Sequence, residues 1–332
     1  MCIAPTLYPL LQYLLLMDDD IAFRHTFYFV NELIPEKARQ KIPCKCYNYF
    51  GKSTAQKFNR RWQKFRIRFF KHIDFPFLKK VEFFGNDIPY GSLLIGKSSY
   101  NLLPDAPNCL TLNSQYNSAE FLRMQNKANS LIGRLQRLVF GDIFVHYFGY
   151  NRQCKAVFMT EENTSPTLEG KTVQIHSLQS QWDSASEEKK NFIMGLFDIT
   201  DNDIMILKTR PNLFFSQPFI NDCGLTETEY TNVLAQIFKN YPSNSIIIKT
   251  HPRDHFDYAK HFPDIIIFSK PISSQLIVLM GVTPQKIITI TSTAIEGFPE
   301  SVECDYYGIH IHPKIEHYFG ENYKPKRIVN YK

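Results

Sequence analysis

The sequence has no long apolar run, no paired cysteine motif and only 14 glycines, and each scarcity removes a class of protein. The longest uncharged apolar stretch, Leu7 to Met17, is shorter than the ~20 residues that cross a bilayer. No basic residue precedes it and Asp18, Asp19 and Asp20 follow it, so we expect no secretory signal peptide. The seven cysteines are scattered without a CxxC pair, which indicates a reducing compartment, expected to be the cytoplasm, and no structural zinc.

Several common catalytic and cofactor motifs are also missing. The chain contains no P-loop, no GxGxxG fingerprint and no GxSxG nucleophile elbow. Its 44% hydrophobic and 21% charged residues are typical of a globular protein rather than a disordered one. The 332 residues suggest two domains at ~150 residues each.

Positive charge is concentrated in one window, residues 51–80. Ten Lys or Arg and one acid give this window +9, so the rest of the chain is −3 within a net charge of +6. Phe58, Trp62, Phe65 and Phe69 recur there at the period of one helix face. Two interpretations stay open: peripheral contact with an anionic membrane, on the inner face of the cell membrane, or a helix packed on a sheet with its bases in water. No RNA-binding, zinc-finger or basic-zipper signature is present, so no nucleic-acid partner is expected.

In the first half of the chain, strand-like segments alternate with helical patterns, which favours a parallel sheet covered by helices. The polar residues 161–170, continued by 184–190, are the best candidate for a connection between domains. The expected strands are residues 1–5, 26–30, 93–95 and 109–112, and the expected helices are residues 10–17 and 118–138.

The second half repeats this alternation more clearly. Thr226 followed by Glu229 is a capping-box signature for the start of a helix over 226–241. We expect residues 203–207 to approach a strand over 213–216, further strands over 246–249, 265–268 and 286–290, and a helix over 273–280. The chain is therefore predicted to be an α/β protein of GT-B type, with two Rossmann-like domains, residues 1–180 and 200–332, facing each other across a cleft.

The sharpest local feature is the block Lys249-Thr250-His251-Pro252-Arg253, which follows an apolar strand. Ligands of open α/β sheets bind at the carboxyl ends of strands, and Pro252 restricts the backbone of His251. A histidine held there could act on a phosphate as a general acid or a fixed cation. The alternative is a surface histidine in a turn.

A second feature follows the strand over 286–290, which ends in Thr291, Ser292 and Thr293. Hydroxyls at a helix start can hold a phosphate, although they can also serve only as a cap. Together with His251, they suggest a phosphate bound between two neighbouring strand ends.

The His-Pro block and the later Ser-Thr strand end resemble the bacterial sialyltransferases of GT-B type, most closely glycosyltransferase family 52, which includes lipooligosaccharide and capsule enzymes. The likeness includes residues 6–16, 213–218, 247–254 and 291–299. It implies an inverting transfer of sialic acid from CMP-sialic acid to a terminal galactoside of a surface glycan, without metal or further cofactor. The N-terminal domain would face the acceptor and the C-terminal domain would bind the nucleotide sugar. The implied nucleotide-binding residues are Lys249, His251, Pro252, Ser269, Thr291, Ser292 and Thr293, with His251 also catalytic and cytidine expected between His251 and Ser274.

The sequence departs from the family at an acidic pair that usually follows an N-domain strand. Asn113, Ser114 and Gln115 stand at the corresponding place, and none of them can take a proton at neutral pH. The acceptor hydroxyl still needs a base. The candidates are Asp222, in the loop after the strand over 213–216, and Glu120, just beyond the altered motif.

Other interpretations stay open. A metal-dependent transferase could use Asp201-Asn202-Asp203, although this triplet more naturally forms a turn, and a metal hydrolase could use His251 with Asp254 and His255, or His310 and His312 on one strand face. A different nucleotide sugar, a non-catalytic membrane-surface scaffold in polysaccharide assembly, and a homodimer are further alternatives.

Overall fold

The computed structural model describes residues 1–31, 34–48, 57–88, 91–105, 118–160, 170–320, 323 and 329–332. These residues form two compact units, Met1–Leu196 and Phe197–Lys332. The predicted strand over 109–112, the altered motif at 113–115 and most of the predicted connection over 161–170 lie outside the described residues. None of the described helices is long and apolar enough to cross a membrane.

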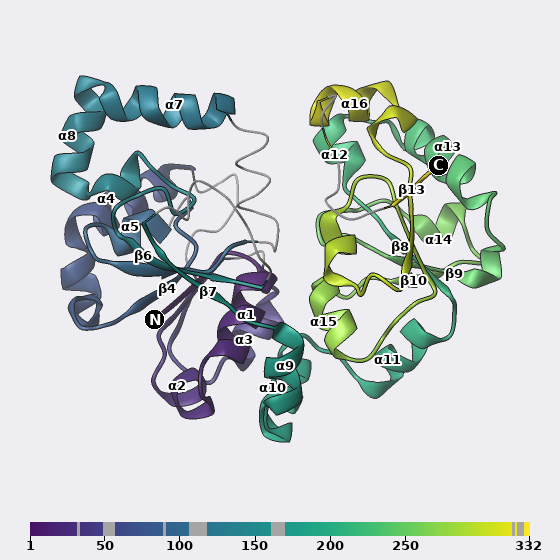
Figure 1. The fold of residues 1–332 in the computed structure, drawn as a ribbon, viewed down its shortest axis with the longest axis horizontal. Helices are drawn as coiled ribbons and strands as arrows, with labels where there is room; N and C mark the ends of the chain where they lie inside the picture. The colour runs from purple at the N-terminus through teal and green to yellow at the C-terminus, as the bar shows by residue number, and fades with distance from the viewer. Residues whose placement is uncertain are drawn as a thin grey trace. The chain divides into compact units, whose positions relative to one another are not determined.

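The N-terminal unit is built on a parallel sheet of seven described strands (Figure 1). Its order, β3-β2-β1-β4-β5-β6-β7, reverses direction between β1 and β4, as in Rossmann folds. The strands are β1 (Cys2–Ala4), β2 (Tyr28–Val30), β3 (Cys46–Asn48), β4 (Phe83–Gly85), β5 (Tyr100–Leu102), β6 (Cys154–Met159) and β7 (Thr172–Ile175). The strands predicted over 1–5 and 26–30 are confirmed as β1 and β2.

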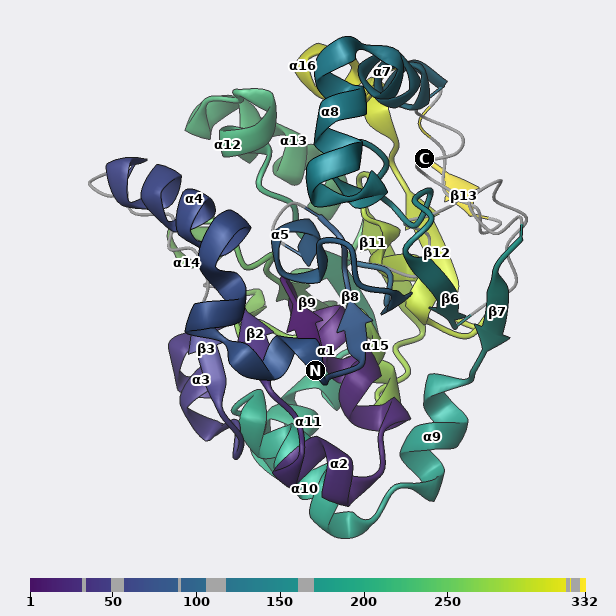
Figure 2. The same ribbon diagram turned by 90° about the vertical axis from the view of Figure 1, so that its left-hand side faces the viewer.

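Short and longer helices connect these strands (Figure 2). The prediction of a strand over 93–95 is wrong, because these residues belong to helix α5 (Gly91–Ile95). In the sequence, strand β4 precedes this helix and strand β5 follows it. A short apolar run does not by itself distinguish strand from helix. The helices are α1 (Leu7–Leu16), α2 (Asp19–Arg24), α3 (Glu36–Lys41), α4 (Lys57–Asp74), α5 (Gly91–Ile95), α7 (Ser118–Asn129), α8 (Leu131–Phe140), α9 (Leu178–Ser184) and α10 (Glu187–Leu196), with 3-10 turns η2 (Pro76–Lys79) and η3 (Asp142–Phe144).

The single helix predicted over 118–138 is two helices. Ser130 has an extended backbone and its hydroxyl accepts a hydrogen bond from the N–H of Gly133 (3.0 Å), so Ser130 caps the start of α8. The apolar periodicity continues through both helices, and this continuity hid the break between α7 and α8.

The C-terminal unit has a second parallel sheet, in the order β10-β9-β8-β11-β12-β13. Numbered from β8 this is the order 3-2-1-4-5-6 of a dinucleotide-type Rossmann fold, whose direction reverses between β8 and β11. The strands are β8 (Asn212–Phe215), β9 (Ile246–Lys249), β10 (Ile266–Phe268), β11 (Lys286–Thr289), β12 (Glu303–Tyr306) and β13 (Asn330–Tyr331). The four strands predicted in this half are confirmed within a residue or so at each end.

The helices of this unit confirm two predictions and correct one. Thr226 and Glu229 form the predicted capping box of α13, and α15 occupies the helix predicted over 273–280. Residues 203–207 do not extend toward a strand, because they lie in α11, which Thr200 and Asp203 cap. The helices are α11 (Asp201–Lys208), α12 (Phe219–Cys223), α13 (Glu227–Phe238), α14 (Tyr258–His261), α15 (Ser274–Leu279) and α16 (Pro313–Phe319), with 3-10 turns η5 (Ser243–Ser245), η6 (Thr293–Gly297) and η7 (Ile309–Ile311).

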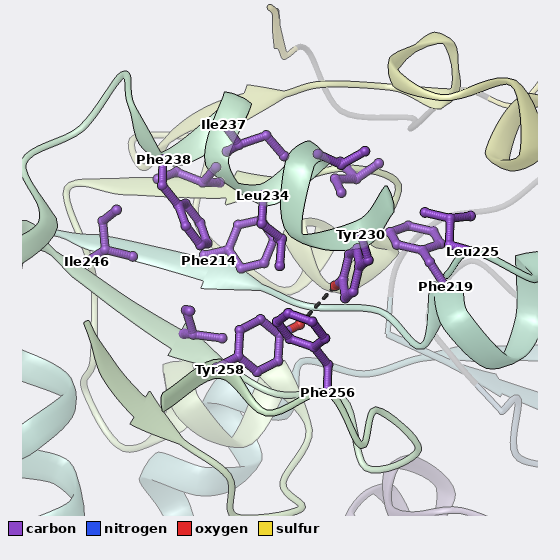
Figure 3. Packing of buried hydrophobic residues seen from close by; sticks show 14 of the residues in the cluster. Phe214, Phe219, Leu225, Tyr230, Leu234, Ile237, Phe238, Ile246, Phe256 and Tyr258 are labelled. Atoms are coloured by element: carbon purple, nitrogen blue, oxygen red, sulfur yellow. Dashed lines mark hydrogen bonds between the residues drawn. The ribbon is translucent and has the colours of Figure 1, made fainter. Parts of the chain in front are cut away.

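The core of this unit packs α13 against the sheet (Figure 3). Phe214 of β8 and Phe238 of α13 meet edge to face with ring centroids 5.0 Å apart. At the other end of α13, the hydroxyls of Tyr230 and Tyr258 are hydrogen bonded at 2.8 Å, so both buried phenols have a partner (Figure 3). This packing fixes the carboxyl ends of β8 and β9, where the candidate site lies.

Candidate functional site

Lys249, His251 and the segment Thr291 to Thr293 lie at the carboxyl ends of strands β9 and β11 of the C-terminal sheet. All the described strands of this sheet are parallel, so the segments after β8, β9 and β11 all leave it at the carboxyl ends of the strands. The direction of strand order reverses between β8 and β11, and these segments lie beside that point. The prediction that His251 and the Ser-Thr segment follow neighbouring strands is wrong, because β8 lies between β9 and β11. The segment after β8, Ser216 to Pro218, therefore separates the two predicted halves of the site.

His251 is half-buried two residues beyond the end of β9. Its Nδ1 accepts a hydrogen bond from the backbone N–H of Arg253 (3.1 Å), so the neutral ring carries its proton on Nε2. Burial, together with the positive charges of Arg253 and Lys249, lowers the pKa of His251 to about 4. The unliganded histidine is therefore a neutral N–H donor at neutral pH.

A partly buried hydrogen-bond network holds the backbone of this histidine. The backbone N–H of His251 donates to Ser216 Oγ (3.0 Å), and that hydroxyl donates to Asp254 Oδ2 (2.5 Å). Asp254 also accepts from the hydroxyl of Tyr258 (2.6 Å), which is paired with Tyr230 in the core. Burial raises the pKa of Asp254, and the bonds from Ser216 and Tyr258 oppose that rise. The turn between β9 and α14 is thus bonded to the segment after β8 and to α13, which fixes the backbone that carries His251.

Lys249 is buried at the end of β9. Its Nζ donates to the backbone carbonyl of Thr250 (2.7 Å), and burial lowers the pKa of the amine to about 7. Its positive charge lowers the pKa of His251. The Lys249 amine is therefore buried beneath the turn that carries His251 and is not exposed at the surface of the site.

Thr291, Ser292 and Thr293 differ in what their side chains contact. The N–H and hydroxyl of Thr291 both donate to Gln217 Oε1 (3.0 and 2.5 Å), and Thr291 is buried. The hydroxyl of Ser292 accepts from the N–H of Ala294 (3.2 Å) and caps η6, while half-buried Thr293 is the first residue of η6. Gln217 thus holds this segment against β8, and Ser292 and Thr293 are the more accessible pair.

Asp222 lies in the short helix α12 rather than in the predicted loop, and it forms an ion pair with Arg253, which follows His251 in the turn after β9. The guanidinium of Arg253 donates to both carboxylate oxygens, each at 2.8 Å. This two-bond pairing links α12 to the His251 turn. A proton accepted by Asp222 would weaken it.

The other predicted residues are more dispersed. Pro252 is exposed directly after His251, and Ser269 is exposed after β10, the edge strand of the sheet. Glu120 is the third residue of α7, and its side chain lies outside the described part of the structure.

Several of the residues considered for metal binding have other partners. Within the described ranges, no group of three or more His, Cys, Asp or Glu side chains could hold a metal ion. The prediction that His310 and His312 share a strand face is wrong, because His310 lies in η7, where it pairs with Glu316 (3.0 Å), and His312 caps α16. Asp201-Asn202-Asp203 forms the first turn of α11 rather than a free turn.

The structure shows one carboxylate that the sequence did not single out, Asp105. It lies half-buried just after β5, and its Oδ1 accepts a hydrogen bond from the hydroxyl of Thr6, which follows β1 (2.7 Å). Burial raises the pKa of Asp105, and the bond from Thr6 opposes that rise. The carboxyl ends of β1 and β4 flank the reversal of strand order in this unit, and β5 is next to β4. A short Leu-Leu-Pro-Asp segment gives no periodic signal, so only the strand order reveals this placement.

A second carboxylate of the N-terminal unit, Asp87, accepts several hydrogen bonds from within that unit. It accepts from the hydroxyl of Tyr100 (2.6 Å), from Asn151 Nδ2 (3.0 Å) and from the N–H groups of Phe148 and Gly149 (3.1 and 2.9 Å). Asp87 is buried and joins β4 to the loop before β6.

The two units have the strand order of Rossmann folds, and comparison with known proteins gives the family. The family model for glycosyltransferase family 52 matches residues 78–315. This is more than half of the chain, which belongs to glycosyltransferase family 52. An uncharacterised Haemophilus influenzae protein is 31% identical over 173 residues, 52% of this chain and 56% of that protein. The chain thus spans little more than half the length of that relative.

Solved structures with the same fold are bacterial sialyltransferases. A Photobacterium phosphoreum enzyme described as an α/β-galactoside α-2,3-sialyltransferase aligns with a TM-score of 0.57 and 12% identity, over 95% of this chain and 93% of that one. A 2,6-sialyltransferase from a Photobacterium species, solved with CMP and lactose, aligns with a TM-score of 0.59 and 11% identity, over 92% and 71%. The GT-B domain of the Photobacterium damselae sialyltransferase aligns with a TM-score of 0.56 and 11% identity, over 92% of this chain and 91% of that one. The predicted GT-B fold is confirmed.

Proposed function

We propose that this glycosyltransferase moves sialic acid from CMP-sialic acid to a terminal galactoside of a surface glycan, with inversion and without a metal ion. The observation that carries the proposal is His251, fixed as an Nε2–H donor at the sheet edge where nucleotides bind in this fold. The neighbours of the same fold support the substrates, since one is described as acting on galactosides and another was solved with CMP and lactose.

The donor phosphate would gain negative charge as its bond to the sugar breaks. His251 Nε2–H, with the hydroxyls of Ser292 and Thr293 on the other side of β8, would meet that charge. A dianionic CMP beside His251 raises the pKa of the imidazole from its low unliganded value, because an opposite charge favours the protonated ring. Lys249, buried beneath the turn, would contribute positive charge. The cytidine would lie toward Ser269. Thr291, bonded to Gln217, would hold the segment that carries Ser292 and Thr293 in position.

The acceptor hydroxyl would attack the anomeric carbon from the face opposite the phosphate and lose its proton to a base. Asp222 and Glu120 remain proposals for that base, and the structure adds Asp105. A raised pKa makes Asp105 a better proton acceptor than an ordinary carboxylate. Asp105 lies at the carboxyl ends of the strands of the N-terminal sheet, in the unit predicted to face the acceptor.

Two measurements test the function. CMP, but not UDP, UMP or GDP, is expected to raise the melting temperature, since a nucleotide that binds only the folded chain stabilises it by RT ln(1 + [L]/Kd). CMP release from CMP-sialic acid should then increase when lactose is added. Stabilisation by a uridine or guanosine nucleotide alone would identify a different donor, and CMP binding without release would favour the scaffold interpretation.

Single variants distinguish the three candidate bases. Asp105→Asn, Asp222→Asn and Glu120→Gln each keep the side-chain shape and remove the proton acceptor. The variant of the true base should lose transfer to lactose by ~10²-fold or more, while CMP binding is kept. If all three transfer normally, none of these residues is the base.

A further inference from the structure

A pocket of about 370 Å³ in the N-terminal unit lies beside the carboxyl end of β4, and we call it the β4 pocket. Asp87 and Ile88, which follow this strand, line it, together with Ser92 of α5 and Tyr147, whose side chains carry hydroxyls. The strand order of this sheet reverses between β1 and β4. Ligands of open α/β sheets bind beside such a point, so the β4 pocket lies where a substrate of this unit is expected.

Three basic side chains line the β4 pocket from two helices. Lys64 and Arg68 belong to α4, Lys127 belongs to α7, and all three are exposed. Lys127 Nζ donates to the backbone carbonyl of Phe144 (3.0 Å), which uses one of the three N–H donors of the ammonium group. The guanidinium of Arg68 lies over the rings of Phe140 and Phe144, 4.7 and 5.2 Å from their centroids. These contacts hold two of the three positive charges at the wall of the pocket.

Apolar side chains complete the lining of the β4 pocket. They are Leu93 of α5, together with Ile143 and Phe144 of η3. Leu93 and Ile143 also belong to the hydrophobic core of this unit, which includes Ile67 of α4. The helix α4, which carries two of the bases, is therefore anchored in the same core as the apolar wall. A pocket built on packed elements can hold its charged groups in place for a ligand.

The acid that lines the β4 pocket, Asp87, has its own hydrogen-bond donors. Its carboxylate accepts from the hydroxyl of Tyr100, from Asn151 Nδ2 and from the N–H groups of Phe148 and Gly149. Burial raises the pKa of Asp87, and these hydrogen bonds oppose that rise. The donors bonded to this carboxylate are neutral groups rather than the three lysine and arginine side chains. With three bases against one acid, the lining of the pocket has a surplus of positive charge.

We propose that the β4 pocket binds an anionic substituent, phosphate or carboxylate, of the acceptor glycan. Arg and Lys are the side chains that recognise these groups, and a volume of about 370 Å³ lies within the range of small-molecule sites. This inference rests on the proposed function, because the N-terminal unit is the one predicted to face the acceptor. It narrows the acceptor to a galactoside that carries a negative charge away from its terminal galactose.

Three acceptors with the same terminal galactose test this inference: lactose, lactose 1-phosphate and lactobionic acid, which carries a carboxylate. The kcat/KM for at least one charged acceptor, measured by CMP release from CMP-sialic acid, should exceed that for lactose at least tenfold. This is the effect of one hydrogen bond to a charged group. The preference should decrease at high salt, and the better charged acceptor identifies the group that binds. Equal kcat/KM values for all three acceptors would overturn the inference.

Variants of the pocket lysines test whether the preference arises in the β4 pocket. Lys64→Gln combined with Lys127→Gln should lower the ratio of kcat/KM for the charged acceptor to that for lactose at least fivefold. Lys37→Gln is the matched control, because Lys37 is an exposed lysine of the same unit, on α3, and does not line this pocket. The control should keep the ratio of the unmodified chain. A ratio that the double variant leaves unchanged would place the charge recognition elsewhere and overturn the inference.

Calorimetry without a sugar donor separates this inference from the proposed function. At least one of lactose 1-phosphate and lactobionic acid should bind the full chain at least tenfold more tightly than lactose, and the Lys64/Lys127 variant should lose that difference. If CMP-sialic acid is not the donor, no acceptor is sialylated, yet this difference in binding should remain. Transfer to lactose with no preference for a charged acceptor would support the proposed function and overturn the inference.

Discussion

Replacing His251 with alanine tests the chemistry most directly, because the structure separates its effect on activity from its effect on folding. The imidazole accepts one hydrogen bond, from the exposed Arg253 N–H, and the backbone bond to Ser216 remains in the variant. Losing one such bond costs about 0.5–1.5 kcal/mol of unfolding free energy. Losing a positioned acid or charge partner slows transfer by ~10²–10⁴-fold, or about 2.7–5.4 kcal/mol in the barrier.

The pH dependence of this loss reports the working form of the ring. The pKa of His251 is about 4 in the unliganded chain, so the free enzyme presents a neutral N–H at about pH 6 and about pH 8 alike. We therefore expect the kcat/KM ratio of His251→Ala to the unmodified enzyme, measured by CMP release, to be equally low at both. A wild-type-like kcat/KM would remove His251 from the mechanism. A deficit present at about pH 6 and absent at about pH 8 would show that the imidazolium already present in the free enzyme is required.

Two further predictions concern the surroundings of His251. Ser292→Ala combined with Thr293→Ala should weaken CMP binding by about 1–3 kcal/mol, because two hydroxyl donors to a charged phosphate are lost. Calorimetry measures this change, and an unchanged affinity would mean that the two hydroxyls serve only the start of η6. Lys249 binds a proton less readily in the folded chain, where its pKa is about 7, than in the unfolded chain. The unfolded state therefore holds more protons between about pH 7 and about pH 10, and this residue makes stability rise with pH there by at most about 1.4 kcal/mol per unit. Urea unfolding of Lys249→Met should show a smaller rise than the unmodified chain, and identical pH slopes would contradict the buried position of the amine.

The C-terminal unit was largely predictable because its local signals agree. Apolar runs such as Ile246 to Lys249 are long enough to define buried parallel strands, and the Thr226 and Glu229 pair marks a helix start without reference to the rest of the fold. The N-terminal unit was harder. Its three-residue strands β4 and β5 carry no readable period, and the apolar pattern of α7 and α8 runs through the break at Ser130.

The sequence by itself determined an α/β protein with His251 at one strand end and hydroxyls at a later one, and its resemblance to glycosyltransferase family 52 indicated a transferase. Only the tertiary structure decided how these parts meet. Strand order depends on pairing between distant segments, so no local pattern revealed that β8 separates β9 from β11, or that Gln217 holds Thr291. The same holds for helix α4. A periodic apolar stripe shows that a helix has two faces, and only the packing of Ile67 and Lys71 decides which face is buried. The exposed side chains of Trp62, Phe65 and Phe69 contradict the interpretation in which this stripe packs on the sheet.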